Sequence, residues 1–263
     1  MRKEISWVLL LLILCDPVQG RVQAGGSWLI APPKVPSFPI PWNPGERLRY
    51  SVSWANFLVA AELVLQVKGR ESAQGILVDH LSVEARTVGI VDRMIYRIND
   101  RYESWISLQP GQPSRAEALQ LHGRKRQESL LILDPQSRKA TLGNGRVLPI
   151  PPETVDLGAL TYHLRSLKWE AGKPHDLTVL DGTKLHLLRG EFESHERVTV
   201  PAGEFDTVRI ALQLGENGTF DDTYKIRLNL STDSRRLPVL LRAIPPWGEV
   251  RAELASAQQV AGP

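Results

Sequence analysis

The chain has 263 residues, with 32 lysines and arginines, 29 aspartates and glutamates, and one cysteine. Its formal net charge of +3 is spread over both signs, which excludes the concentrated basic face that nucleic-acid binding needs. A single cysteine excludes an internal disulfide framework, so the fold must be stabilised by its own apolar core, which a chain of this length can bury.

Residues 1–24 are expected to form a secretory signal peptide. A basic start precedes an apolar run at residues 5–14. That run is too short for a permanent membrane helix of about 20 residues, and the small residues after it permit cleavage after Gly20 or Ala24. No later apolar segment approaches that length. We therefore expect a mature chain without a transmembrane segment that is exported to the periplasm.

Cys15 raises the alternative of lipidation. The stretch LILC resembles a lipoprotein signal, in which the cysteine becomes the lipid-anchored first residue. Such signals have a small residue directly before the cysteine, and Leu14 is large. We therefore favour an unmodified Cys15 that is removed with the signal peptide.

Residues 25–45 are predicted to be an extended leader because six of them are prolines. Proline fixes φ and lacks an N–H donor, so the segment cannot form a regular element. Trp28 and Trp42 are candidates for tethering this leader to the folded part. A single β domain is predicted to span residues 46–256, followed by a disordered tail at 257–263.

From residue 46 onward, apolar and polar side chains alternate in one segment after another. Clear examples are residues 47–54, 61–68, 81–86, 224–231 and 249–254. A period of two indicates antiparallel strands with one buried and one solvated face. About a dozen such strands cannot lie flat in water. The predicted fold class is therefore all-β, with a strongly curved or closed antiparallel sheet, a barrel or half-barrel.

The stretch ERVTVPAGEFDTVRIALQL, residues 196–214, predicts a β-hairpin. Alternating apolar side chains flank residues 201–203, whose Pro-Ala-Gly sequence has the chemistry of a turn. We interpret this join as a reversal of the chain that sets the strand register, and not as an active site.

One segment breaks the period of two and predicts a single short amphipathic helix. Four leucines recur at helical spacing within residues 156–169. Asp156 can cap its start, and Gly172 and Pro174 follow its end. We expect a helix of about 14 residues that covers one opening of the curved sheet.

The sequence lacks the motifs of common catalytic and cofactor-binding sites. It has no Gly-x-Ser-x-Gly elbow, no Gly-rich phosphate loop and no His-Glu-x-x-His pair. The six histidines do not have metal-ligand spacing. We expect no metal and no cofactor, and we favour a non-catalytic function. A hydrolase of envelope components is the alternative, if two acidic residues converge as in glycoside hydrolysis.

The dense basic cluster HGRKRQE spans residues 122–128. One interpretation is a hairpin tip, where charge deters the pairing of exposed strand edges. The other is that Arg124, Lys125 and Arg126 contact the phosphates of lipopolysaccharide or another anionic envelope component.

Five blocks of the sequence carry a resemblance to one family. They are PGERLRYSVSW (44–54), DLGALTYHLRSL (156–167), DGTKLHLL (181–188), ERVTVPAGEFDTVRI (196–210) and LSTDSRRLPVLLRAIPPWGEVRAEL (230–254). Their order and spacing are similar to the bacterial exported-protein family catalogued as domain of unknown function 3108. The resemblance implies export and no particular activity. One departure is Asn229, where we expect an aromatic or apolar residue.

We expect a binding module for a lipid or other apolar ligand. A curled sheet lined by Leu, Val and Ile can enclose an apolar cavity, with the helix as its lid. The candidate ligand-binding residues are Asp156, Tyr162, Arg165, Tyr50 and Trp54. Tyr162 and Arg165 share one side of the helix, and a structural network that anchors the helix is the favoured interpretation of that pair.

The alternative is a structural or interaction protein of the cell envelope. Its inner face would be a packed core, and an envelope protein partner would bind the leader or an exposed strand edge. Tyr50, Trp54, Tyr96 and Trp105 would then fill the inner face and leave no room for a ligand. The volume of the interior therefore discriminates between these two functions.

Overall fold

The computed structural model describes residues 40–55, 58–73, 75–108, 114–216, 219–246 and 248–259. The predicted signal peptide and most of the predicted leader, with Cys15 and Trp28, lie outside these residues, as does 260–263 of the predicted tail. None of the helices in the described ranges is long and apolar enough to cross a membrane.

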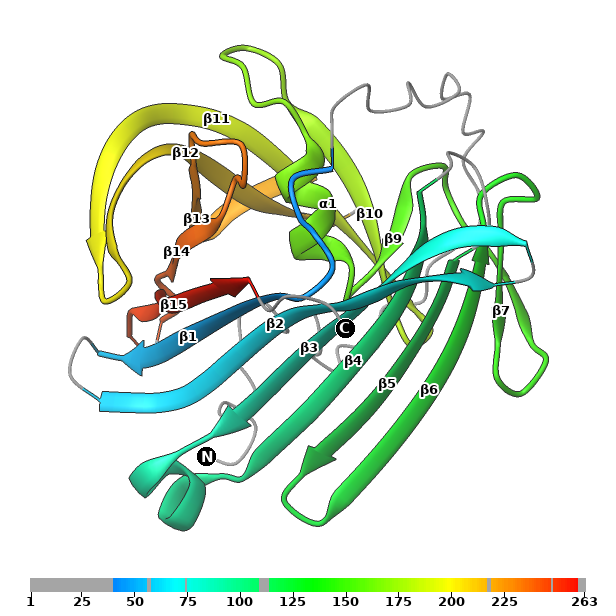
Figure 1. The fold of residues 1–263 in the computed structure, drawn as a ribbon. Coiled ribbons are helices and arrows are strands. Elements are labelled where there is room, and N and C mark those ends of the chain that lie inside the picture. Colours follow the sequence, from blue (N-terminus) through cyan, green and yellow to red (C-terminus); the bar gives the residue numbers. More distant parts are fainter. Residues whose placement is uncertain are drawn as a thin grey trace.

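Fifteen strands of the described chain form one curved sheet that does not close, an open half-barrel (Figure 1). They are β1 (Glu46–Trp54), β2 (Leu58–Ala73), β3 (Ile76–Thr87), β4 (Ile98–Ser107), β5 (Ser114–His122), β6 (Lys125–Asp134), β7 (Lys139–Leu142), β8 (Val147–Pro149), β9 (Thr154–Asp156), β10 (His175–Asp181), β11 (Lys184–Val200), β12 (Gly203–Glu216), β13 (Thr219–Ser231), β14 (Pro238–Ala243) and β15 (Val250–Gln259). The predicted all-β class is confirmed, with more strands than the expected dozen.

The sheet order brings the two ends of the domain together. β1 pairs with β2 on one side and with β15 on the other, so the first and last strands lie in the middle of the sheet. β15 continues to Gln259 opposite Glu46, so residues 257–259 are strand, where a tail was predicted. The sheet edges are β8 and β9, of three residues each, and β9 pairs in parallel with β10.

The period-two pattern positions the main core as predicted. In β1, the side chains of Leu48, Tyr50 and Val52 are buried, whereas Arg49 between them is exposed. The equivalent faces of β2 to β4 and β10 to β15 supply most of the rest of this core. A second, smaller core lies elsewhere on the sheet and consists of Ala116, Leu131, Leu133, Ala140, Ile150 and Leu180.

The helix is shorter and more deeply buried than predicted. α1 (Leu160–Ser166) has seven residues instead of about 14, because residues 154–156 extend as strand β9 before it and Leu167 is extended after it. Five of the seven side chains are buried, and α1 lies on the concave side of the sheet (Figure 1). The predicted short helix is therefore present, and it is packed into the main core.

Close packing fixes both ends of α1. A Cβ atom on Gly158, just before the helix, would lie 2.5 Å from the Ser104 hydroxyl on β4, so only glycine fits there. After the helix, the Trp169 indole donates a hydrogen bond to the Leu164 carbonyl at 3.1 Å and its ring lies over Gly190 of β11. These contacts hold the segments on both sides of α1 in place.

The predicted hairpin at residues 196–214 is confirmed. Val200 at the end of β11 pairs with Gly203 at the start of β12, which leaves Pro201 and Ala202 as the loop. Gly203 has a φ of +132°, which side chains rarely adopt. The Ala202 N–H donates to the carbonyl of Leu254 at 3.0 Å, so the turn is fastened to β15 and has a structural role.

Candidate functional site

Arg165 on α1 is the centre of a buried polar network. Its guanidinium group forms a bidentate ion pair with Glu46 on β1, at 2.6 and 2.9 Å. Its Nη2 group, which is shared with Glu46, also donates to the carbonyls of Pro41 at 3.1 Å and Arg235 at 2.8 Å, and Nε donates to that of Arg236 at 3.2 Å. Arg165 therefore connects the helix to β1, to the segment before β1 and to the β13–β14 connection.

Aromatic rings enclose this ion pair. The guanidinium carbon lies 5.8 Å from the ring centroid of Trp42 and 5.4 Å from that of Tyr162. The two rings meet edge to face at 5.3 Å, and the Trp42 indole donates to the Asp79 carboxylate at 3.0 Å. Trp42 thus tethers the end of the leader to the domain, as predicted.

The other predicted ligand-binding residues belong to the interior as well. The Tyr50 hydroxyl donates to the Pro238 carbonyl at 2.7 Å. Asp156 is buried, accepts hydrogen bonds from Ser104 and from the Ala159 N–H, and has a pKa raised by that burial. Trp54 is half-buried and packs against the main core. Burial also raises the pKa of Tyr162, whose hydroxyl has no hydrogen-bond partner among the described residues.

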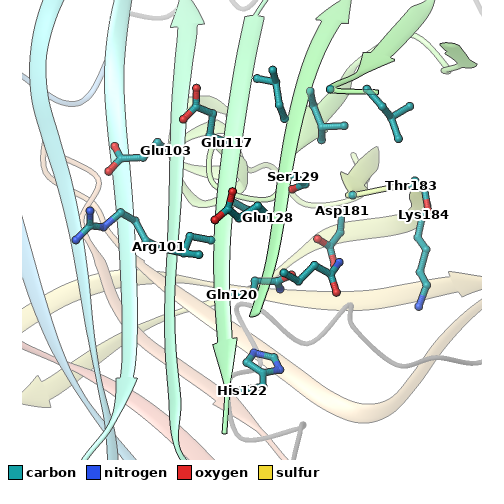
Figure 2. A pocket seen from close by; sticks show the side chains of 18 of the residues that line it. Arg101, Glu103, Glu117, Gln120, His122, Glu128, Ser129, Asp181, Thr183 and Lys184 are labelled. Carbon is teal, nitrogen blue, oxygen red and sulfur yellow. The ribbon is translucent and has the colours of Figure 1, made fainter. Parts of the chain in front are cut away.

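A cavity of the structure lies away from these predicted ligand-binding residues. A concave space of about 1180 Å³ is lined by residues of β4, β5 and β6, by Leu142 and the turn after β7, and by the β10–β11 turn. Figure 2 shows Asp181, Thr183 and Lys184 on one side of it and the strands β4 to β6 on the other. None of the five predicted ligand-binding residues belongs to the described lining.

Along the β5–β6 hairpin, the inner face of the cavity wall changes from apolar to basic, while the lining as a whole also includes the acidic residues Glu103, Glu117, Glu128 and Asp181. From the middle of the hairpin to its turn, the opposed pairs on the inner face are Ala116–Leu131, Ala118–Ser129, Gln120–Gln127 and His122–Lys125. Leu131 pairs in turn with Leu142 of β7. All of these residues except Ala116 line the cavity. The inner face has largely buried methyl groups at one end, amides and a hydroxyl in the middle, and an imidazole and an ammonium group at the turn end.

Buried hydrogen bonds hold the polar part of this wall in place. The Asp100 carboxylate, which is 2 % exposed, contacts His122 at 2.8 Å and accepts from the Leu121 N–H at 3.0 Å. The Gln120 amide donates to the Tyr102 hydroxyl at 2.7 Å. Because these groups are satisfied within the protein, the wall is preorganised.

Sequence reasoning missed this cavity for a physical reason. Leu119 and Leu121 alternate with Gln120 and His122, and the pattern alone would place the leucines inside. The register instead turns the polar side chains inward, in line with Tyr102 and Ile98 of β4. An unbroken alternation does not indicate which face of the strand points to the concave side of the sheet. The basic character of the adjoining turn was the signal that could have drawn attention to it.

The basic cluster lies at the β5–β6 hairpin turn, as one of its two interpretations predicted. His122 pairs with Lys125, which leaves Gly123 and Arg124 as the turn. Arg126 forms an ion pair with Glu128. Lys125 borders the cavity.

The departure from the family pattern at Asn229 lies away from the cavity. Its side chain is 1 % exposed and donates to Glu196 at 2.7 Å and to the Thr207 hydroxyl at 2.9 Å. The amide therefore links β13 to β11 and β12.

Replacing Arg165 with leucine tests whether the network is an anchor. The Arg165→Leu variant leaves the Glu46 carboxylate buried without its partner, so we expect the free energy of unfolding to fall by about 3–5 kcal/mol. Urea titration followed by tryptophan fluorescence measures this. Arg86→Leu, which removes an exposed pair with Glu62, is the control and should change stability by no more than about 1 kcal/mol. A loss in Arg165→Leu as small as in the control would contradict an anchoring role.

His163 on α1 gives the helix a pH-dependent contribution to stability. Burial, with a smaller effect from His175, lowers the pKa of His163 from 6.5 to about 4. The folded protein therefore favours the neutral ring, and this stability is present above pH 6.5 and is lost as the pH falls towards 4. In the His163→Gln variant, urea titrations between pH 7 and 4 should show a shallower fall than in the wild type. The exposed His195→Gln variant should retain the wild-type slope, and an unchanged slope in His163→Gln would contradict the assignment.

Comparisons with known proteins agree with the fold. No curated protein matches the chain. A β-barrel-like protein of domain of unknown function DUF1849 from Brucella abortus has a similar structure, with 10 % identity and a TM-score of 0.56 over 82 % of this chain and 98 % of that one. At this identity the likeness concerns the fold alone. A protein of the DUF1089 family from Pseudomonas aeruginosa is more distant, with 12 % identity and a TM-score of 0.39 over 73 % and 94 % of the two chains.

The family model described as "Protein of unknown function (DUF3108)" matches residues 49–255. This range includes almost every described strand and the whole of α1. The chain therefore belongs to the DUF3108 family of proteins of unknown function, and its fold is β-barrel-like.

Proposed function

We propose that the protein is an exported, non-catalytic binding module that holds an anionic, amphipathic lipid of the cell envelope in the cavity. The observation that carries this proposal is the gradient along the cavity wall, from Leu131 and Leu142 to His122 and Lys125. An acyl chain fits the apolar end, and a phosphate or carboxylate head group fits the end that carries the ammonium group.

The size of the cavity supports a ligand of this class. Its volume of about 1180 Å³ is slightly above the range of pockets for drug-sized molecules, which is roughly 300–1,000 Å³. A single lipid with short or partly inserted chains would fit such a space. The mixture of amides, hydroxyls and leucines on the wall favours an amphipathic molecule over a purely apolar one.

Because the cavity lies outside the main core, the proposed binding residues differ from those predicted from the sequence. Tyr50, Tyr162 and Arg165 are within the main core or its ion-pair network, where an apolar ligand would have to displace packed side chains. We therefore assign the ligand to the β5–β6 hairpin and the β10–β11 turn, and we assign Asp156, Tyr162, Arg165, Tyr50 and Trp54 to the scaffold.

Export is part of the proposal and is supported by the sequence of residues 1–24, with a basic start, a short apolar run and small residues for cleavage. A periplasmic location would expose the protein to envelope lipids.

An interaction protein that recruits a partner by strand addition is the second candidate function. Strand addition uses a long, accessible sheet edge. The terminal strands β8 and β9 have three residues each, but residues 191–200 of β11 and 125–130 of β6 have no strand partner on their outer side among the described residues.

Blocking the cavity tests the proposal. Ser129 is half-buried and borders the cavity, so Ser129→Trp should fill the space and lower the occupancy by a co-purifying lipid at least about tenfold. Native mass spectrometry of protein extracted gently from its own envelope measures the bound mass, and uptake of dihexanoyl-phosphatidylglycerol measures binding by the purified protein. Thr141→Trp, on an exposed position of β7, is the matched control.

Gln127→Trp provides a second blocking variant, since this side chain is exposed and its replacement should not impair folding. Wild-type protein that carries no lipid and takes up no phosphatidylglycerol would overturn the proposal. So would folded Ser129→Trp and Gln127→Trp variants that bind lipid as well as Thr141→Trp does.

A further inference from the structure

We propose that one end of the half-barrel docks on an anionic membrane surface. This end, which we name the docking tip, consists of the β3–β4 connection at residues 88–97 and the β5–β6 turn at residues 122–126. The connection contains a five-residue π-helical turn, η2 (Val91–Ile95). In Figure 1, η2 and the β5–β6 turn lie at the same end of the sheet, below the strands.

Direct contacts hold the two parts of the docking tip together. The Gly123 N–H donates to the Arg97 carbonyl at 2.8 Å. The rings of Tyr96 and His122 meet edge to face, with their centroids 6.3 Å apart. The η2 turn is also attached to the body, because Val91 is 2 % exposed and packs against Ala60 of β2. The two segments of the docking tip are therefore held together as one continuous surface.

Large apolar side chains of η2 and its flank are exposed to water. The exposed fractions are 53 % for Ile90, 78 % for Met94 and 43 % for Ile95. Val91 in the same turn is buried. The turn and its flank therefore have one apolar side chain that packs against the body and three apolar side chains that face water. Adjacent apolar side chains at a protruding end are the arrangement that inserts into the boundary between lipid head groups and acyl chains.

The docking tip also carries several cations. Arg93, Arg124 and Lys125 form no ion pair with a described carboxylate, whereas Arg97 pairs with Asp92 and Arg126 pairs with Glu128. The docking tip thus carries three positive charges that are not compensated by a paired acid. Anionic head groups would supply the complementary charge, and lysine and arginine side chains next to an apolar insertion favour an anionic bilayer over a neutral one.

A membrane fits this surface better than a protein partner. Stable protein interfaces bury roughly 800 Å² on each side and exclude unpaired charges from their centre. The docking tip combines a few exposed apolar side chains with three cations that have no paired acid, and so matches a charged, fluid surface. Lys125 belongs both to the docking tip and to the cavity wall, which places the cationic end of the cavity next to the membrane. Membrane docking does not depend on the cavity holding a ligand.

Vesicle binding tests the proposal with protein purified after export, whose processed N-terminus is read by mass spectrometry. We expect binding to vesicles of phosphatidylcholine with 30 % phosphatidylglycerol, weaker binding at high salt, and little binding to phosphatidylcholine alone. The Met94→Asp and Arg124→Glu/Lys125→Glu variants should each bind at least about tenfold more weakly. Because all of these side chains are exposed, the substitutions should leave the fold intact.

Two controls are matched to these variants. Leu77→Asp changes an exposed apolar residue at the opposite end of β3, and Lys139→Glu/Arg146→Glu reverses two exposed cations near β7. Both should bind like the wild type. Met94→Cys labelled with an environment-sensitive dye should shift to shorter emission wavelengths on the anionic vesicles, whereas labelled Leu77→Cys should not.

Equal binding of the docking-tip variants and their controls would overturn membrane docking. So would wild-type protein that does not distinguish the two vesicle compositions. If Met94→Asp abolished an in-cell cross-link to another protein while vesicle binding was unchanged, the surface would serve that protein and the proposal would be wrong. Ser129→Trp should still bind vesicles, so failure of lipid uptake and failure of membrane docking are distinguishable.

Discussion

The ion pair between Arg165 and Glu46 is the interaction on which the interior of this half-barrel depends. Removing a guanidinium group and a carboxylate from water is costly, and the cost is offset only when every donor and acceptor finds a partner. Here the partners come from β1, from the segment before β1 and from the β13–β14 connection. Satisfying Arg165 therefore requires several distant parts of the chain to be in place together.

The position of α1 divides the concave side into a filled part and an open part. Leu160, Tyr162 and Leu164 complete the main core between β1 to β4 and β10 to β15. The helix contributes no residue to the described lining of the cavity beside β4 to β7. The interior is thus filled beside α1 and open beside β4 to β6, where the cavity lies. The filled part supports the open part, which is where we propose that the ligand binds.

Much of the fold follows from local chemistry. Alternation predicted the strands, and the Pro-Ala-Gly turn predicted the β11–β12 hairpin, because both depend on neighbours in the chain. The segment before α1 packs Gly158 against Ser104 of β4, and the role of Arg165 depends on acceptors at positions 41, 46, 235 and 236. Contacts so distant in sequence leave no periodic signal. The direction in which Gln120 and His122 face has the same origin, since register alone decides it.

The cavity and the docking tip share the β5–β6 hairpin. Lys125 and His122 are at the junction, with the lining on one side and the turn on the other. Placing the cationic end of a binding cavity beside a membrane surface would shorten the path of a lipid head group between the bilayer and the protein. The two proposed properties would then serve a single purpose, the exchange of an anionic lipid with a membrane.

A double-mutant cycle between Arg165 and Glu46 tests the central claim most directly. Urea unfolding of Arg165→Leu, Glu46→Leu and the double variant gives the coupling energy between the two side chains. We predict a coupling of at least about 2 kcal/mol, with the double variant more stable than the sum of the single losses implies, because neither charge is then left buried alone. Single losses that add to within about 0.5 kcal/mol would contradict the claim that this pair organises the interior.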